Sequence, residues 1–504
     1  MALFASLDIG TTGVKAIVCN ESGVILSEKR SSAYPVYSDK AGWAEQSPQD
    51  WWHGACTCLS QIVKDPKINS NDILAIASDS HTDGCTAVDA DGRPLARSII
   101  WMDRRAYDQC PTELESVREI YETTGLACDP YHVAPKIEWL RENRPEVYAK
   151  TYKFLNPNDY ILLRLTGEFV TDYTLASCTM LFDIRKRVWS DKMTAQFNVS
   201  VEKLPKIVSS QSIVGEVTSQ AALETGLRKG TQVVAGGGDQ EVALVGAGAI
   251  SPGIVCDITG GAEPIGTTTA ETRFDPTRTL ELHAHPDPDL WIVESPGITS
   301  GENLEWFCKE FGTMKGGDIT DPFRVLDQEI ETTPPGADGL VFLPYTMGSI
   351  TPEWNPHARG AFLGFSLLHK RAHFARSIQE GASYGLRDVC VLMERMGLPV
   401  ERIVAAGGGA KSAVWCQMKS DVTKKMVLVP KIKSVSAYGS AMLAAVGTGQ
   451  LSSLKVASEK WVEYDRIFEP SEPRGITYDG LYETYTSAYW SLKGIFLKLS
   501  ELQK

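Results

Sequence analysis

Two aspartates each follow an apolar segment, at a position from which a carboxylate can bind a metal ion or accept a proton during phosphate chemistry. The first is Asp8. It follows the apolar segment 3–7 and precedes the small-residue turn Gly10-Thr11-Thr12-Gly13. A carboxylate at such a strand end can hold Mg²⁺ through water, while threonine hydroxyls and backbone N–H groups hold phosphate oxygens. The same position also suits an aspartate that only caps its own turn. Asp8 is therefore a candidate metal ligand.

The second aspartate is Asp239, which follows the apolar segment 232–235 and the run Gly236-Gly237-Gly238. Phosphoryl transfer to an alcohol needs a carboxylate that orients or deprotonates the attacking hydroxyl. We predict that the three glycines form a tight turn, which leaves room for substrate beside the carboxylate. Asp239 is the candidate catalytic base, and a purely structural aspartate is the alternative.

A polar cluster, His81-Thr82-Asp83, follows another short apolar segment at 73–77. Its donors and acceptors suit a polyhydroxylated ligand, whose hydroxyls need hydrogen bonds once they leave water. The alternative is a structural histidine whose hydrogen bonds are satisfied within the protein. We treat the cluster as a candidate sugar site.

Three glycine-rich turns each follow an apolar segment, at Gly10–Gly13, Gly260-Gly261 and Gly407–Gly409. Glycine lets backbone N–H groups approach an anion closely, so three such turns beside two acids favour a nucleotide and a metal. A P-loop is excluded, because its spacing needs a glycine directly before Lys411, where Ala410 stands.

The elements that must position these residues alternate between strand and helix, which indicates an α/β fold. Segments 3–7 and 14–19 predict a hairpin, and Ser47-Pro48 opens a helix that Asp50 caps in an acidic capping box. Further short strands are predicted at 73–77, 85–88 and 232–235.

The second half repeats the opening of the first, since Asp257-Ile258-Thr259-Gly260 echoes Asp8-Ile9-Gly10-Thr11. We therefore predict two similar lobes, 1–250 and 251–504, around a central cleft. Within the second lobe the pattern predicts a long amphipathic helix over 374–396, a strand at 403–406, and a closely packed helix over 437–446.

Composition excludes several classes of protein. The chain has 504 residues, 43% hydrophobic and 22% charged, with a net charge of −13. That charge argues against nucleic acid or an anionic membrane as a partner. Eleven scattered cysteines and no apolar leader fit reduced thiols in the cytoplasm, and no segment reaches the eighteen apolar residues of a membrane span.

Taken together, these motifs resemble the FGGY family of carbohydrate kinases, relatives of actin and hexokinase. The resemblance covers essentially the whole chain. Its pieces in the first half are the opening Asp8–Thr12, Gly42-Trp43-Ala44-Glu45-Gln46, Trp101-Met102-Asp103-Arg104-Arg105, Lys136–Leu140 and Thr171-Asp172. In the second half they are Pro344-Tyr345, Thr351-Pro352, Ala358–Phe362, Gly360-x-Phe362-x-Gly364-Phe365, His373–Ile378, Gly407–Ser412 and Trp415-Cys416-Gln417.

The resemblance implies two ribonuclease-H-like lobes that close on a cleft. It makes Asp239 the base and Asp8 the Mg²⁺ ligand. It assigns substrate binding to His81, Thr82, Asp83, Asp239 and Gln240. It assigns nucleotide binding to Gly10, Thr11, Thr12, Lys15, Thr259, Gly260, Gly261, Gly407, Gly408, Gly409, Lys411 and Ser412.

Two departures from the family pattern bear on the substrate and on the phosphate. Xylulose kinases usually carry Gln-Met-His-Gly where this chain has His81-Thr82-Asp83-Gly84, and glycerol kinases carry Arg-Glu there. Family members also tend to have a threonine where Gly261 stands, so a phosphate-facing threonine is missing here, and Thr259 is the candidate to compensate for it.

The resulting prediction is an ATP- and Mg²⁺-dependent kinase of a small sugar, with D-xylulose the best single candidate because the second half looks most like xylulose kinases. Another pentulose, a pentitol, erythritol, glycerol or gluconate are the alternative substrates. A different class also remains open, a non-catalytic actin-like protein that binds nucleotide. Members of the family are often homodimers, so a homodimer is possible.

Overall fold

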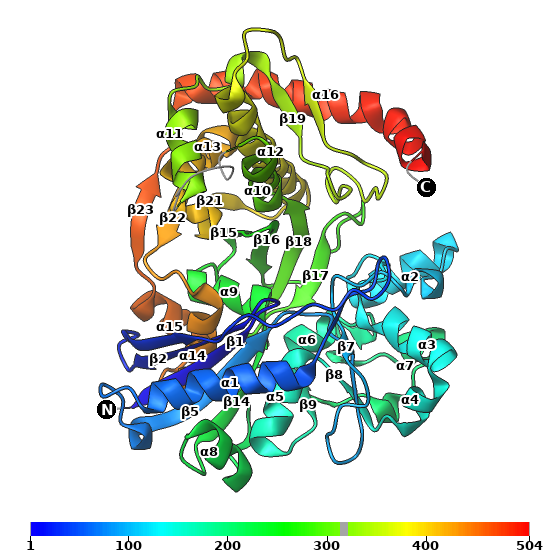
Figure 1. The fold of residues 1–504 in the computed structure, drawn as a ribbon, viewed down its shortest axis with the longest axis vertical. Coiled ribbons are helices and arrows are strands. Elements are labelled where there is room, and N and C mark those ends of the chain that lie inside the picture. Colours follow the sequence, from blue (N-terminus) through cyan, green and yellow to red (C-terminus); the bar gives the residue numbers. More distant parts are fainter. Residues whose placement is uncertain (1, 313–320, 503–504) are drawn as a thin grey trace.

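The chain folds into two lobes, each built on a mixed sheet, in a computed structural model that describes residues 2–312 and 321–502 (Figure 1). The first sheet has the strand order β13-β14-β5-β1-β2-β3. Its strands are β1 (Leu3–Ile9), β2 (Val14–Asn20), β3 (Ile25–Arg30), β5 (Ile73–Ser80), β13 (Ile213–Glu216) and β14 (Gln232–Gly238).

The second sheet has the order β17-β18-β16-β15-β21-β22-β23. Its strands are β15 (Gly253–Thr259), β16 (Ala262–Thr269), β17 (Glu281–Ala284), β18 (Trp291–Thr299), β21 (Val400–Gly407), β22 (Met426–Pro430) and β23 (Tyr464–Phe468). Strand β15 pairs antiparallel with β16 and parallel with β21, just as β1 pairs antiparallel with β2 and parallel with β5. The four-residue echo in the sequence therefore marks equivalent strands of two similar lobes.

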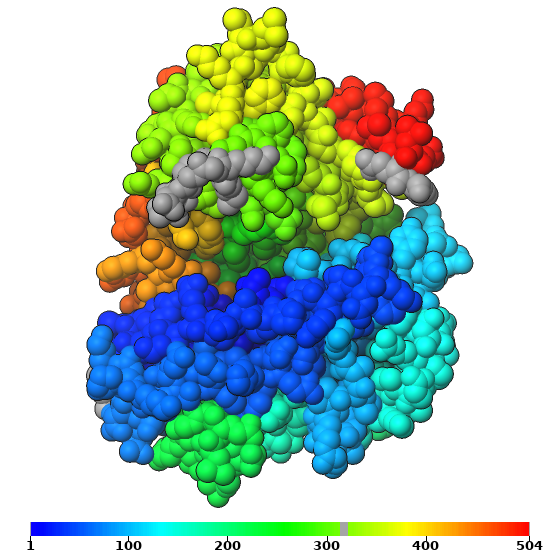
Figure 2. Space-filling view, viewed as in Figure 1, coloured from blue at the N-terminus to red at the C-terminus, as the bar shows by residue number. Residues whose placement is uncertain are grey.

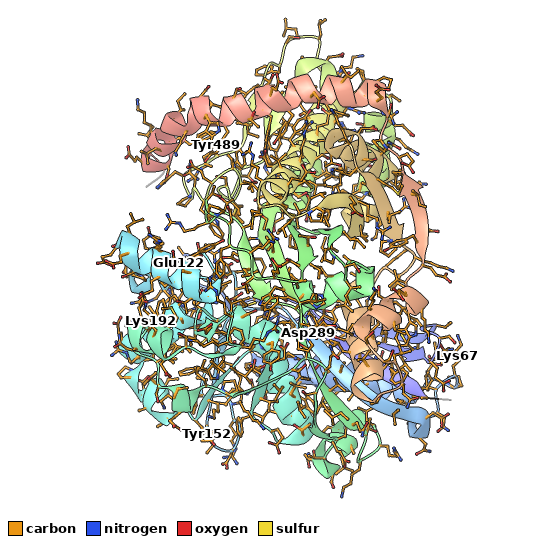
Figure 3. The ribbon with its side chains drawn as sticks, turned by 180° about the vertical axis from the view of Figure 1, so that it is seen from behind. Lys67, Glu122, Tyr152, Lys192, Asp289 and Tyr489 are labelled. Carbon is orange, nitrogen blue, oxygen red and sulfur yellow. The ribbon has the colours of Figure 1, made fainter. Side chains whose placement is uncertain are left out.

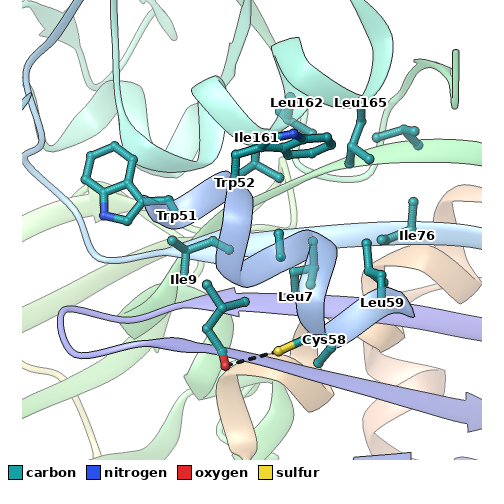
Figure 4. Close-up of a cluster of buried hydrophobic side chains, with 14 of the residues drawn as sticks. Leu7, Ile9, Trp51, Trp52, Cys58, Leu59, Ile76, Ile161, Leu162 and Leu165 are labelled. Atoms are coloured by element: carbon teal, nitrogen blue, oxygen red, sulfur yellow. Dashed lines mark hydrogen bonds between the residues drawn. The ribbon is translucent and has the colours of Figure 1, made fainter. Parts of the chain in front are cut away.

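Helix α1 (Pro48–Val63) covers one face of the first sheet. Trp51, Trp52 and Leu59 are buried against Leu7 and other strand residues, as Figure 4 shows. The helix begins where the sequence predicts, but the predicted capping box is wrong. The Ser47 side chain does not cap the helix; its hydroxyl donates to Gln49 Oε1 at 2.9 Å.

The opposite face of the first sheet is covered by α14 (Val435–Gly447), a helix from the second half of the chain. It packs on α9 (Asp239–Ala247), where a Cβ on Gly439 would lie 2.2 Å from Val242 O. Small residues therefore permit this close helix contact, as predicted. In Figure 1, α14 lies beside the blue strands of the first lobe, and Figure 2 shows orange residues of the second half in contact with blue residues of the first.

The loop between β17 and β18 also touches the first lobe. Figure 3, seen from behind, places its Asp289 at the junction of the lobes. Arg187 Nη2 donates to Leu290 O at 2.8 Å, and Gln211 Nε2 donates to Pro286 O at 3.2 Å. The two halves therefore share contacts through this loop as well as through α14, and Leu290 packs against the same hydrophobic cluster as α14.

The remaining elements surround these two sheets. The predicted long helix is α12 (Arg371–Arg395). The other helices are α2 (Leu114–Thr124), α3 (Val133–Asn143), α4 (Pro145–Lys150), α5 (Pro157–Thr166), α6 (Tyr173–Ser177), α7 (Asp191–Gln196), α8 (Ser219–Thr225), α10 (Gly301–Glu310), α11 (Pro322–Glu331), α13 (Ala413–Thr423), α15 (Leu454–Trp461) and α16 (Glu472–Leu502).

Short strands complete the fold: β4 (Glu45–Gln46), β6 (Thr86–Val88), β7 (Ser98–Ile99), β8 (Lys153–Leu155), β9 (Val170–Asp172), β10 (Phe182–Asp183), β11 (Val188–Trp189), β12 (Lys206–Val208), β19 (Val341–Leu343) and β20 (Ala361–Leu363). Over the residues that the structure describes, no helix combines the length and the apolar character that crossing a bilayer requires.

Candidate active site

The two predicted carboxylates lie at the same edge of the first sheet. Asp8 is near the end of β1, and its register partner on the parallel strand β5 is Asp79. Asp239 is the first residue of α9, directly after β14, which pairs with the other side of β5. The carboxyl ends of parallel strands thus bring Asp8 and Asp239 to one edge.

The predicted tight turn at Gly236–Gly238 is wrong, because these glycines are the last three residues of β14. The strand is irregular between Val234 and Gly237. Gly236 has a φ of +72°, and a Cβ there would lie 1.7 Å from Ser78 O on β5. The glycine is needed for this close approach of two strands and for its left-handed backbone.

The environment of Asp239 raises the pKa of its carboxyl well above the usual value. The surrounding protein removes water from the carboxyl, and the negative charges of Asp8 and Glu241 add repulsion. A raised pKa means a higher proton affinity of the ionised carboxylate, which favours its role as a proton acceptor.

Asp79 is a third carboxylate of this edge that the sequence reasoning did not single out. Its side chain is buried, Ser440 Oγ of α14 donates to Oδ2 at 2.7 Å, and Oδ1 has no hydrogen-bond partner among the described residues. Burial and the charge of Asp8 raise the pKa of its carboxyl. Its place opposite Asp8 depends on strand register, which the local sequence does not reveal.

The turn after Asp8 is held by two of the motifs that carry the family resemblance. Gly10 N donates to Gly13 O at 3.1 Å, which closes the turn. Gln46 Nε2 donates to Thr11 O at 2.6 Å, and Trp101 Nε1 donates to Thr11 Oγ1 at 3.0 Å. The Thr11 backbone and hydroxyl are therefore fixed by distant parts of the chain.

Lys15 lies opposite Asp8 on the neighbouring strand, and its Nζ is 3.0 Å from Asp8 Oδ2. Both side chains keep some exposure to solvent, 21% for Lys15 and 14% for Asp8. A carboxylate and an ammonium side by side offer one group for a divalent cation and one for a phosphate.

The predicted sugar cluster follows β5 directly; His81 and Asp83 are buried, and Thr82 is partly exposed. His81 packs edge-on against Trp51, with ring centroids 5.6 Å apart, and burial lowers the pKa of its imidazole to about 4. Thr82 Oγ1 donates to Asp83 Oδ2 at 2.9 Å. Asp83 Oδ1 lies 3.0 Å from Nδ1 of a buried histidine, His132. Gln240, the second residue of α9, is partly exposed beside Asp239.

Beyond Asp83 the structure shows a network of buried acids and histidines that the sequence reasoning missed. Burial alone would lower the pKa of His132, but Asp83 and Glu281 raise it to about 10. Likewise Glu294 and Glu281 raise the pKa of His283 to about 9 against the effect of burial. Strand β17 carries Glu281 and His283 on alternate positions, and that spacing was the available signal.

The glycine turns of the second lobe also meet at one strand edge. Thr259 at the end of β15 is the register partner of Gly407 at the end of β21, and a Cβ on Gly409 would lie 2.6 Å from Thr259 Cβ. Gly260 and Gly261 continue from Thr259 and are exposed, as are Gly407 and Gly408. This edge presents glycine backbone to solvent.

The hydroxyl of Thr259 is engaged inside the lobe. It donates to Asp257 Oδ1 at 3.0 Å and accepts a hydrogen bond from Lys419 Nζ at 2.5 Å, and Thr259 is 1% exposed. Because this hydroxyl is already hydrogen-bonded, only backbone groups at Thr259 remain to contact a phosphate. A Cβ at Gly261 would lie 3.0 Å from Cγ of Glu302, so Glu302 occupies the space that a threonine side chain would need.

After Gly409 the chain forms a short 3₁₀ turn and then α13. The Ser412 hydroxyl accepts a hydrogen bond from Trp415 N at 3.1 Å and so caps this eleven-residue helix, while Lys411 is exposed. The site residues predicted from the sequence thus form two groups, the carboxylate edge of the first sheet and the glycine edge of the second.

The two lobes have similar topology, and each is built on a mixed sheet. This is the two-domain α/β fold shared by actin and hexokinase. The models of the FGGY family of carbohydrate kinases, N-terminal domain and C-terminal domain, match residues 3–246 and 260–448. The chain belongs to this family, and it is a carbohydrate kinase.

Individual relatives agree on the family and differ in the sugar that they are named for. The chain is 31% identical over 506 residues to a xylulose kinase of Bacillus subtilis, covering 100% of both proteins. It is also 31% identical over 504 residues to a gluconokinase of the same organism, covering 98% of this chain and 95% of the relative. The crystal structure of a xylulose kinase from Rhodospirillum rubrum superposes with a TM-score of 0.88 and 27% identity, covering 98% and 99% of the two chains.

Proposed function

We propose that the protein transfers the γ-phosphoryl group of ATP to a hydroxyl of a small sugar, with D-xylulose the best single candidate. Asp239 is the general base of this proposal and Asp8 the Mg²⁺ ligand. His81, Thr82, Asp83 and Gln240 would contact the sugar.

The observation that carries the proposal is the placement of Asp239. Its carboxyl sits at the start of α9 on the strand edge that also carries Asp8, and its surroundings raise its pKa. In the reaction, Asp239 accepts the proton of the attacking hydroxyl while that oxygen forms a bond to the γ-phosphorus. The bond between the γ-phosphorus and the bridging oxygen breaks, and ADP leaves with the electron pair.

The residues present fit Mg²⁺ and a nucleotide. Asp8 supplies the hard carboxylate oxygen that Mg²⁺ prefers, and it is not fully buried. Bound there, Mg²⁺ would offset charge on the phosphate oxygens. Gly10, Thr11, Thr12 and Lys15 would hold phosphate oxygens from the first lobe. The exposed glycines 260, 261, 407 and 408, the partly exposed Gly409, Lys411 and the N-terminus of α13 would face the nucleotide from the second lobe.

Similarity to a xylulose kinase supports D-xylulose as the first candidate, and similarity to a gluconokinase keeps gluconate as the alternative. The charges near the base do not decide between them. Glu281 and Glu294 lie beside His283 and raise its pKa to about 9, so these acids have a cationic partner at neutral pH.

ADP release, measured with each sugar of a panel at saturating ATP and Mg²⁺, tests this proposal. The expected order is a higher kcat/KM for D-xylulose than for pentitols, erythritol, glycerol and gluconate. A preference for gluconate over every neutral sugar would overturn the choice of substrate. ATP binding without sugar-dependent ADP release would favour a non-catalytic nucleotide-binding protein instead.

A further inference from the structure

Three side chains of metal-binding type meet where the two halves of the chain touch. Cys178 follows α6, Glu241 lies in the first turn of α9, and His283 is on β17 of the second sheet. All three are at most 3% exposed. Cys178 Sγ is 3.4 Å from Glu241 Oε1 and 3.5 Å from His283 Nδ1, and the latter two atoms are 3.7 Å apart.

These separations match the edges of a coordination tetrahedron. An ion with ligand distances of about 2.3 Å to sulfur and about 2.0–2.2 Å to nitrogen and oxygen places such atoms roughly 3.4–3.6 Å from one another. The three side chains therefore need little movement to share one ion.

Hydrogen bonding alone leaves this group incompletely satisfied. Cys178 has one S–H proton, yet its sulfur also lies 3.4 Å from Thr174 O, in addition to its contacts with Glu241 and His283. The second carboxylate oxygen of Glu241, Oε2, is buried and lacks a hydrogen-bond partner among the described residues. A buried carboxylate oxygen without a partner is costly unless a cation or a donor is present.

The other side of the histidine is arranged as in metal sites. His283 Nε2 faces Glu281 Oε2 at 3.4 Å and Glu294 Oε1 at 3.5 Å. Carboxylates next to the outer nitrogen of a metal-bound histidine hold the proton there and orient the ring. With Nε2 protonated, Nδ1 is the nitrogen that can bind a cation, which would displace any proton there.

We propose that Cys178, Glu241 and His283 bind a Zn²⁺ ion, with one further coordination position for water. Sulfur, imidazole and carboxylate together suit zinc, whereas Mg²⁺ avoids thiolate, so this site is distinct from the one proposed at Asp8. The ion joins the first half of the chain to β17 of the second. It also fixes the turn of α9 that begins with Asp239, and it offsets the charge of the neighbouring glutamates.

Metal content tests the proposal without reference to kinase activity. Protein produced in zinc-supplemented medium is dialysed against buffer with Mg²⁺ and analysed by mass spectrometry for bound metals. Wild type should retain one zinc per chain, and Cys178→Ser and His283→Gln should retain at least ~10-fold less. The matched control is Cys390→Ser, which removes another buried thiol from a hydrophobic core.

Cobalt supplies a second readout that does not depend on zinc affinity. Zinc-free protein loaded with Co²⁺ should show a thiolate-to-cobalt charge-transfer band in wild type and Cys390→Ser but not in Cys178→Ser, with folding checked by circular dichroism. Wild type that retains no zinc and shows no such band would overturn the proposal. Full zinc retention in both Cys178→Ser and His283→Gln would also overturn it, because the ion would then be bound elsewhere.

Discussion

Replacing Thr174 with valine tests how the backbone beside Asp239 is positioned. Thr174 Oγ1 accepts a hydrogen bond from Gly238 N at 2.8 Å and donates to Asp172 Oδ2 at 2.8 Å. Asp172 is fixed in turn by Ser210 Oγ, which donates to the same oxygen at 2.5 Å. This buried chain of hydrogen bonds ends on the residue directly before the proposed base.

Valine keeps the shape of threonine but leaves the Gly238 N–H without its partner. A buried unsatisfied N–H costs about 1–3 kcal/mol. If the backbone shifts to recover this free energy, Asp239 moves with it. The same ~1–3 kcal/mol added to the activation barrier lowers kcat by about 5- to 160-fold. Thr174→Ser, which retains the hydroxyl, is the matched control and should keep kcat within a few-fold of wild type.

The assay is steady-state ADP release with the best sugar, with thermal unfolding measured in parallel. The positioning role predicts a loss in kcat with little change in the KM for ATP, because the nucleotide would be held by other residues. A Thr174→Val protein with a lower melting temperature but unchanged kcat would refute the reasoning, since the hydrogen bond would then only stabilise the fold.

Three further predictions follow from the charged groups. Asp8→Asn should raise the Mg²⁺ concentration needed for half-maximal turnover, and an unchanged Mg²⁺ titration would contradict its metal role. Burial and the charge of Asp8 raise the pKa of Asp239, so this base stays protonated to a higher pH than an ordinary aspartate; kcat/KM should therefore fall on the acidic side with an apparent pKa well above the usual value of about 3.9, and an apparent pKa near that value would contradict the shift. Lys419→Met leaves two buried carboxylates unpaired and should lower the free energy of unfolding by about 3–5 kcal/mol in denaturant titrations, against at most ~1 kcal/mol for the surface control Lys424→Met. Equal losses in these two lysine variants would contradict that estimate.

Local sequence was enough to predict the elements whose signals lie within a few residues. The hairpin around Gly10–Gly13, the start of α1, the long helix α12 and the small-residue helix α14 all appear where their patterns indicate. The equivalence of β1 and β15 also followed from a four-residue echo. These features depend on periodicity, turn residues and close packing, which neighbouring residues determine.

Features that depend on long-range pairing could not be predicted in this way. The register of β1 and β5 is what places Asp79 opposite Asp8. Lys419 hydrogen-bonds to Asp257, which is 162 positions away in the chain. The glycines before Asp239 look like a turn locally, but the approach of β5 makes them part of a strand. Only the fold shows which distant partner decides each conformation.

The most direct test of the proposed catalytic role compares wild type with Asp239→Asn in sugar-dependent ADP release, with ATP affinity measured separately. Asparagine keeps the size of the side chain but cannot accept the proton of the hydroxyl. The account predicts turnover at least ~10²-fold lower in the variant, with ATP binding nearly intact. Turnover equal to that of wild type in a folded Asp239→Asn protein would contradict the assignment of Asp239 as the base.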